Sequence, residues 1–201
     1  MNILALDLGT KTGWAVHQTV PAPSRGGTGY FLRDGGTWVL SDTKTLLAAR
    51  KAETIRSIDP RFESLLEHLA DACNRYSVEK LIFEDVLFSA YTLQTQLWSS
   101  LRAAVWAIAI SGHLEIDCLN TASLKKFATG HGGATKLMMA AHLVKKHPLE
   151  FSKLAKPFPK RDLYLCKPHE TGLESSFLVD DNEVDARHLL DYALTTSTTG
   201  Q

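Results

Sequence analysis

The chain has 201 residues, and its 22 acidic and 22 basic side chains give no net charge. This length suits one domain with a sizeable core and is short for two, so we expect a single domain over residues 1–201. The hydrophobic content of 44% is ordinary for a globular protein, and no apolar run reaches the roughly 20 residues of a membrane-spanning helix, so no membrane partner is expected.

Two features of the sequence favour a cytoplasmic location. The chain enters its first apolar run directly after Met1 and Asn2, without the basic and small-residue segments of a signal peptide. The three cysteines lie far apart and show no Cys-x-x-Cys spacing, which argues against a disulfide framework or a zinc site.

Short apolar runs bounded by turn residues predict strands, and apolar residues at helical spacing predict helices. In chain order, we expect strands at 3–8, 13–16 and 36–40, a helix at 60–73, a strand at 80–84, a helix at 93–110, a strand at 114–119, helices at 121–128 and 134–146, and a last helix at 184–194. This order predicts an α/β fold with a mixed five-stranded sheet flanked by helices.

The remaining segments carry turn and capping signals. Residues 19–36 are rich in Gly, Pro and Ser and are expected to form a loop, and residues 147–179 an irregular excursion with a hairpin through 163–165 and 177–179. Asp59 and Thr121 are expected to cap the helices that follow them. Trp14 and Trp106 are expected to have structural roles.

Three acidic residues lie at positions where burial of a carboxylate would cost free energy. Asp7 ends the apolar run 3–6, Glu84 ends the run 81–83, and Asp185 lies inside the last expected helix. A buried carboxylate needs a positive partner, and a divalent metal ion would serve. Two such ions held ~3.5 to 4 Å apart can assist phosphodiester hydrolysis.

The start of the last helix offers further ligands. Asn182 and His188 lie three residues before and after Asp185 and could share its face, and Asp181 is another possible ligand. The alternative is that residues 180–183 only cap the helix and interact with its dipole.

Charge is unevenly distributed along the chain. Residues 125–167 hold nine Lys and one Arg against two acids, a net charge of +8, whereas residues 168–201 carry −6. A basic stretch beside an acidic one suits a phosphate backbone that lies next to a metal site. The alternative is two unrelated solvated surfaces.

Four segments in chain order resemble RuvC-type Holliday junction resolvases of the ribonuclease H-like superfamily, especially phage-encoded members. These segments are Ile3–Ala15, Leu81–Glu84, Thr129–Lys136 and Asp181–Ala186. The resemblance implies a ribonuclease H-like fold and a homodimer that cuts four-way DNA junctions by paired symmetric nicks. It also favours the cytoplasm of a bacterial or phage-infected cell.

The resemblance implies roles for individual residues as well. Asp7, Glu84 and Asp185 would be catalytic and would hold Mg²⁺, or Mn²⁺ in its place, with two ions per site. Asn182 stands where the family commonly has an Asp or His ligand, and as a neutral side chain it is a weaker ligand, so Asp181 remains an alternative.

DNA contacts are expected outside the acidic cluster. The glycines of residues 129–133, Gly130 and Gly132 among them, would let backbone amides approach a phosphate, and Lys136 would add a positive charge. Lys125 would contact the DNA backbone. Phe88 would stack on an unpaired base, unless it belongs to the core.

Two other functions stay open from the sequence. One is a YqgF-type ribonuclease H-like nuclease that acts on RNA, because the opening Asp-x-Gly-Thr-Lys segment is close to that family too. The other is a non-catalytic nucleic-acid-binding module in which the acids only cap a helix.

Overall fold

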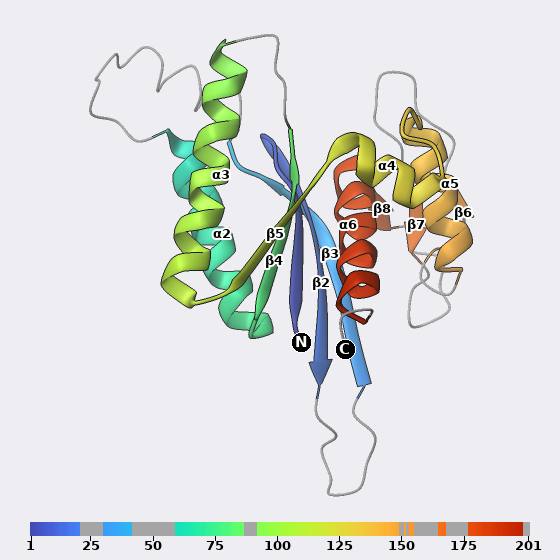
Figure 1. Cartoon of the computed structure of the whole chain (residues 1–201), viewed down its shortest axis with the longest axis horizontal. Coiled ribbons are helices and arrows are strands. Elements are labelled where there is room, and N and C mark those ends of the chain that lie inside the picture. The colour runs from blue at the N-terminus through green and yellow to red at the C-terminus, as the bar shows by residue number, and fades with distance from the viewer. Residues whose placement is uncertain are drawn as a thin grey trace, which may run out of the picture.

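A mixed five-stranded sheet in the order β3-β2-β1-β4-β5 forms the centre of the molecule (Figure 1). The strands are β1 (Ile3–Asp7), β2 (Lys11–Val20), β3 (Tyr30–Val39), β4 (Lys80–Asp85) and β5 (Glu115–Asn120). The first three strands pair antiparallel, whereas β4 pairs parallel with both β1 and β5. The predicted mixed five-stranded sheet is therefore confirmed.

Helices cover both faces of this sheet. In the computed structural model, which describes residues 1–20, 30–41, 59–86, 92–148, 151, 153–154, 165–167 and 177–198, α2 and α3 lie on one side of the sheet and α6, with α4 and α5 beyond it, on the other (Figure 1). The helices are α2 (Pro60–Tyr76), α3 (Thr92–Gly112), α4 (Thr121–Thr129), α5 (Lys136–Lys146) and α6 (Asp181–Thr198). No helix in these ranges is long and apolar enough to cross a membrane.

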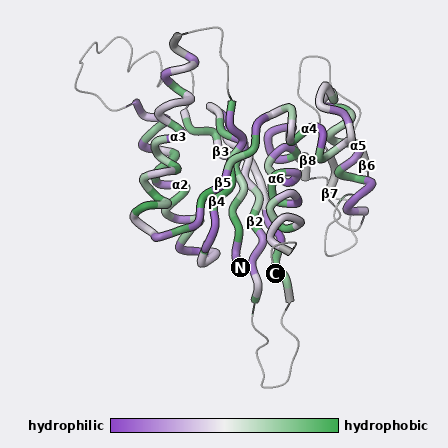
Figure 2. Tube along the Cα trace, viewed as in Figure 1, coloured by the Kyte–Doolittle hydropathy of each residue, from purple (hydrophilic) through white to green (hydrophobic). Residues whose placement is uncertain are grey.

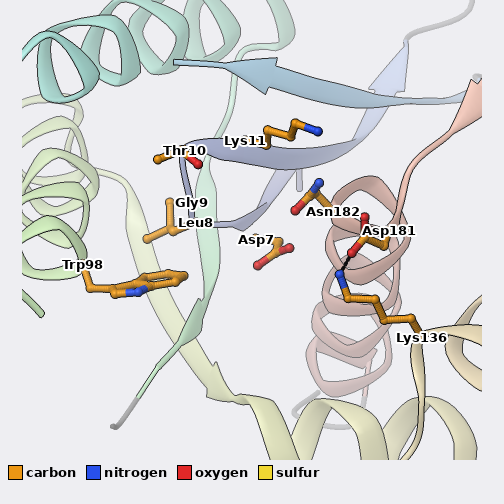
Figure 3. Close-up of a pocket in the computed structure, with 9 residues that line it drawn as sticks. All are labelled: Asp7, Leu8, Gly9, Thr10, Lys11, Trp98, Lys136, Asp181 and Asn182. Carbon is orange, nitrogen blue, oxygen red and sulfur yellow. Dashed lines mark ion pairs between the residues drawn. The ribbon is translucent and has the colours of Figure 1, made fainter. Parts of the chain in front are cut away.

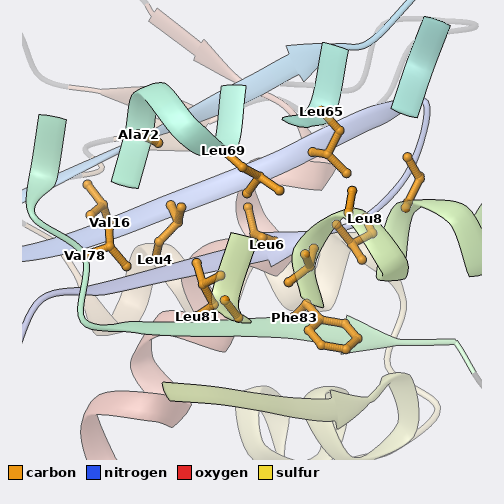
Figure 4. Close-up of a cluster of buried hydrophobic side chains, with 14 of the residues drawn as sticks. Leu4, Leu6, Leu8, Val16, Leu65, Leu69, Ala72, Val78, Leu81 and Phe83 are labelled. Atoms are coloured by element: carbon orange, nitrogen blue, oxygen red, sulfur yellow. The ribbon is translucent and has the colours of Figure 1, made fainter. Parts of the chain in front are cut away.

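The alternation of side chains along β1 builds a core on each face of the sheet. Leu4, Leu6 and Leu8 pack with residues of α2 and α3, among them Leu65 and Leu69 (Figure 4). The intervening residues of β1 point to the opposite face and pack with α6. Figure 2 shows the corresponding pattern, with hydrophobic stretches in the central strands and mixed hydropathy along the surrounding helices.

The third strand is much longer than expected. The prediction of a loop over residues 19–36 is wrong for 19–20 and 30–36, because β2 extends to Val20 and β3 pairs with it without a break from Tyr30 to Val39. Gly35 and Gly36 interrupt the sequence pattern that predicts a strand. Glycine fits at these positions because the packing is close: a Cβ on Gly36 would lie 3.0 Å from the indole nitrogen of Trp14. Trp14 stacks on Trp38 and has a structural role as expected.

Of the two helix caps expected from the sequence, one is confirmed and the other is not. Asp59 caps α2 as predicted, since its side chain accepts a hydrogen bond from the amide of Arg61. Thr121, in contrast, is the first residue of α4, and the cap is Asn120, whose side chain accepts from the amide of Ser123. The prediction of Thr121 as the cap is wrong by one residue, and its hydroxyl is therefore available to another partner.

Part of the expected excursion at 147–179 forms a small antiparallel sheet in the order β6-β7-β8. Its strands are β6 (Lys153–Leu154), β7 (Leu165–Lys167) and β8 (Phe177–Val179). The predicted hairpin is confirmed at Leu165, which pairs with Val179, although β7 continues to Lys167 and residues 163–164 lie outside the described residues. The single-domain organisation over residues 1–201 stays a prediction.

Candidate metal centre

Asp7 and Glu84 are neighbours because of the register of the two central strands. Leu6 of β1 lies beside Phe83 of β4, so the next residue of each parallel strand is an acid at the same edge of the sheet. Both acids continue the rows of side chains that face α6, since Ala5 and Ile82 belong to the core on that side. Two carboxylates therefore meet at the carboxyl ends of β1 and β4.

The third acid comes from α6, which crosses the sheet close to β2. A Cβ on Gly13 of β2 would lie 1.9 Å from the backbone oxygen of Asn182, so only glycine allows the first turn of α6 to approach so closely. Asp180 holds this turn in place. Its side chain accepts a hydrogen bond from the Thr37 hydroxyl at 2.5 Å and from the Glu183 amide at 3.1 Å. Asp185 follows one turn later.

The structure brings the three predicted carboxylates together. One oxygen each of Asp7, Glu84 and Asp185 lies within 4.8 Å of the other two. Glu84 is 7% exposed. Asp7 also lines an open pocket of about 320 Å³ whose wall includes Trp98, Lys136 and the first turn of α6 (Figure 3).

The acids resist ionisation in this arrangement. Burial raises the pKa of Asp7 well above its ordinary value, and the nearby charges of Glu84 and Asp185 raise it further. Burial also raises the pKa of Glu84, and it raises the pKa of Asp185 to about 7, with the charge of Glu84 adding to the effect. Three such carboxylates at one point fit a hard divalent cation, which would relieve the repulsion between them.

Two side chains from outside the acidic cluster act on it. The Thr121 hydroxyl donates a short hydrogen bond to the Glu84 carboxylate, and it can do so because Asn120 is the cap of α4. The positive charge of Lys125 lowers the pKa values of Glu84 and Asp185, partly opposing the effect of burial. The Thr121 contact was not predicted, because it depends on where α4 begins.

The residues expected to provide a fourth ligand take different positions. Asn182 lines the pocket with Asp7, and its amide nitrogen donates to the Asp180 carboxylate at 3.2 Å. Asp181 lines the same pocket and forms an ion pair with Lys136 (Figure 3). This ion pair could not be seen in the sequence, where Lys136 suggested a phosphate contact.

His188 does not share the face of Asp185, and that expectation is wrong. Its ring nitrogen Nε2 contacts the Met139 carbonyl oxygen at 2.9 Å in the core between α5 and α6. Burial lowers the pKa of His188 to about 4, so the ring is neutral and donates this hydrogen bond. Around the axis of an α-helix, a residue three positions before Asp185 and one three positions after it lie about 60° away on opposite sides. Asn182 and His188 therefore point in different directions.

The predicted DNA-contacting residues are only partly described. Gly130 ends α4 in a left-handed conformation with φ of 81°, which favours glycine, and its amide donates to the Lys126 carbonyl. A Cβ on Gly132 would lie 3.3 Å from the Ala122 carbonyl oxygen. Phe88 lies outside the described residues.

Comparison with known proteins shows which fold this is. No protein-family model matches the chain, and no curated protein sequence matches it either. Solved structures do match, and they show a RuvC-like fold of the ribonuclease H-like class.

Two of the similar structures are of RuvC from Thermus thermophilus. One, described as the RuvC structure, superposes with a TM-score of 0.62 at 15% identity and covers 99% of this chain and 97% of that chain. The other is RuvC in complex with Holliday junction substrate, with the same score and identity, and covers 99% and 96%. The yeast mitochondrial Holliday junction resolvase Ydc2 follows with a TM-score of 0.50 at 10% identity, covering 93% and 75%.

Proposed function

We propose that this protein is a metal-dependent endonuclease that resolves four-way DNA junctions by paired symmetric nicks. The observation that carries the proposal is the cluster of Asp7, Glu84 and Asp185 at the sheet edge of a RuvC-like fold. The similar T. thermophilus RuvC binds Holliday junction substrate, and Ydc2 is a Holliday junction resolvase, which supports branched DNA as the substrate here. A cytoplasmic role in a bacterial or phage-infected cell fits this activity.

The side chains of the centre would have different roles in catalysis. Asp7, Glu84 and Asp185 would hold Mg²⁺, or Mn²⁺ in its place, with Asp181 or Asn182 contributing from the first turn of α6. Two bound divalent ions would activate water and stabilise negative charge on the phosphate. Thr121 holds the Glu84 carboxylate in one orientation.

Positively charged side chains lie near the acids. We propose that Lys125 and Lys136, both within electrostatic reach of Asp185, draw the phosphate backbone to the centre. Gly130 and Gly132, in the turn that links α4 to α5, would let the backbone approach a phosphate. Phe88 would stack on a base opened at the junction.

Paired nicks require two centres, so we propose a homodimer and assign its contact to α3 and β5. Three apolar side chains there are exposed, Trp106 by 47%, Ile110 by 76% and Ile116 by 41%. Trp106 and Ile116 line one shallow pocket with Phe83. Trp106, for which a structural role is expected, is about half exposed on α3, where a partner could cover its ring.

Cleavage of a synthetic four-way junction tests the proposal. The wild-type protein is expected to nick the junction in Mg²⁺ far faster than linear duplex DNA or structured RNA. Asp7→Asn should lower the rate by roughly 10³-fold or more, because the loss of a metal ligand removes several kcal/mol of transition-state stabilisation. Junction binding, measured by gel shift in Ca²⁺, should stay intact.

Asp71→Asn provides the matched control. Asp71 lies on α2 with its side chain 66% exposed, and the variant should cut as the wild type does. Preferred cleavage of structured RNA would favour the YqgF-type function. Junction binding without any cutting would favour a non-catalytic module, and full activity in Asp7→Asn would refute the metal assignment.

A further inference from the structure

Asp181 is a buried carboxylate that its surroundings satisfy only in part. The residue is 5% exposed. One carboxylate oxygen pairs with the Lys136 ammonium, and the other is buried without a hydrogen-bond partner in the part of the chain that the structure describes. An unpaired buried carboxylate oxygen is costly, and a cation bound at this point would remove the cost.

The position of Asp181 suits a ligand for the metal centre. It lies four residues before Asp185 on α6, a spacing that places two side chains on one face of a helix. It also lines the pocket that contains Asp7 (Figure 3). Asn182 is less suited, because it is neutral and its amide is tied to Asp180, which itself holds the first turn of α6.

Lys136 already places a positive charge beside this carboxylate. Its side chain is 59% exposed although it pairs with a buried acid, so the ammonium reaches in from the edge of the pocket. The same charge lowers the pKa values of Asp7 and Asp185, so it acts on two of the three acids of the cluster. A lysine side chain has a long flexible stem, so the ammonium can move away from the carboxylate when another cation takes its place.

We propose that Asp181 is a ligand of the second divalent ion and that Lys136 takes the place of this ion in the metal-free protein. The inference rests on the metal centre of the proposed function. When the ion binds, it displaces the Lys136 ammonium from Asp181. The released ammonium lies at the start of α5, beside the glycine-rich turn, and becomes available to a DNA phosphate. Metal loading and phosphate binding are thereby coupled.

Binding of Mn²⁺ to the DNA-free protein, measured by calorimetry and electron paramagnetic resonance, tests this inference without relying on cleavage. The wild type is expected to bind two ions. The near-isosteric Asp181→Asn should weaken one site by roughly 10–100-fold and leave the other. Lys136→Met should tighten that same site by roughly tenfold, because the competing cation is gone. Asn182→Ala should keep both sites, and so should the control Asp71→Asn.

Several outcomes would overturn the inference. Asp181→Asn that binds two ions with wild-type affinity would remove Asp181 from the ligand set, and loss of a site in Asn182→Ala would assign the ligand to Asn182. Unchanged or weaker Mn²⁺ binding in Lys136→Met would refute the exchange. Lys136→Met changes an exposed side chain, so it carries the test even if Asp181→Asn does not fold.

Experiment can refute the proposed function and this inference independently of each other. A wild type that cuts junctions but binds a single ion refutes only the second-ion assignment. A wild type that binds two ions yet cuts no junction refutes only the nuclease proposal.

Discussion

Burial determines the chemistry of the single carboxylates in the metal centre. The pKa of Asp185 is raised to about 7, first by burial and then by the charge of Glu84. The folded protein therefore holds the Asp185 proton more tightly than the unfolded chain does. Between the ordinary pKa of 3.8 and about 7, a rise in pH ionises the group at a cost to the folded state.

This cost should appear in the pH dependence of stability. We compare the free energy of unfolding of the metal-free wild type with that of Asp185→Asn. The wild-type value should fall relative to the variant as the pH rises from about 4 to 7. The expected fall is on the order of 3 kcal/mol, since one pKa unit corresponds to about 1.36 kcal/mol. Urea unfolding of both variants across this range measures the difference. Saturating Mg²⁺ at pH 8 should restore the loss in the wild type, because metal ions bind the deprotonated carboxylate. A difference independent of pH would contradict this account.

The sequence reveals a site residue at this scale where the environment of that residue follows from its own strand or helix, as for Asp185 inside α6. Asp7 and Glu84 could be predicted because each ends an apolar run. The hydrogen bond of Thr121 to Glu84 and the ion pair of Lys136 with Asp181 depend on helix starts and on how helices are rotated. If the start of a helix moves by one residue, both the hydrogen bond and the ion pair change. Capping signals in a sequence do not locate a helix start that accurately.

At the scale of elements, the distance between β2 and α6 decides whether the centre forms. Gly13 permits this approach, because its missing side chain leaves room for the backbone of Asn182. The contact positions the turn that leads to Asp185. The same glycine is therefore needed for both stability and metal binding.

Gly13→Ala should separate the helix from the sheet. The added methyl group meets backbone rather than a flexible side chain, so we expect a loss of about 3 kcal/mol in the free energy of unfolding. Mn²⁺ affinity should fall as well, and both effects can be measured by urea unfolding and calorimetry. Gly112→Ala, where a Cβ would meet only the Leu114 side chain, serves as the control. Wild-type metal affinity in Gly13→Ala would contradict this role of the contact.

The sequence predicts most elements but not their full extent. The helices from 60 onward could be located because apolar spacing and caps agree, as at Asp59 and Pro60. The third strand was shortened in the prediction, since Gly35 and Gly36 interrupt the apolar pattern and reflect packing against Trp14. Such glycines resemble loop signals until the neighbouring elements are known.

At the scale of the whole molecule, the exposed apolar residues of α3 indicate how two copies would meet. Ile110→Glu places a charge on a side chain that is 76% exposed, so the monomer should keep its stability. The dimer should dissociate at least about tenfold more readily, because a buried charge costs several kcal/mol. Sedimentation velocity measures the change, and junction cleavage should shift from paired to single nicks.

Phe31→Glu provides the comparison for this prediction. Phe31 is 68% exposed on β3, at the opposite edge of the sheet from β5, and its substitution should leave the association unchanged. A wild type that is monomeric while it makes paired cuts would contradict the assigned contact.

The candidate metal centre draws its carboxylates from β1, β4 and α6, which are far apart in the chain. During synthesis on a ribosome, the first strand emerges long before the helix that bears Asp185, so an incomplete nascent polypeptide lacks the assembled cluster. Unfolding that separates α6 from the sheet would take Asp185 away from Asp7 and Glu84 in the same way. The DNA cleavage proposed for this centre would therefore be confined to molecules that have folded completely.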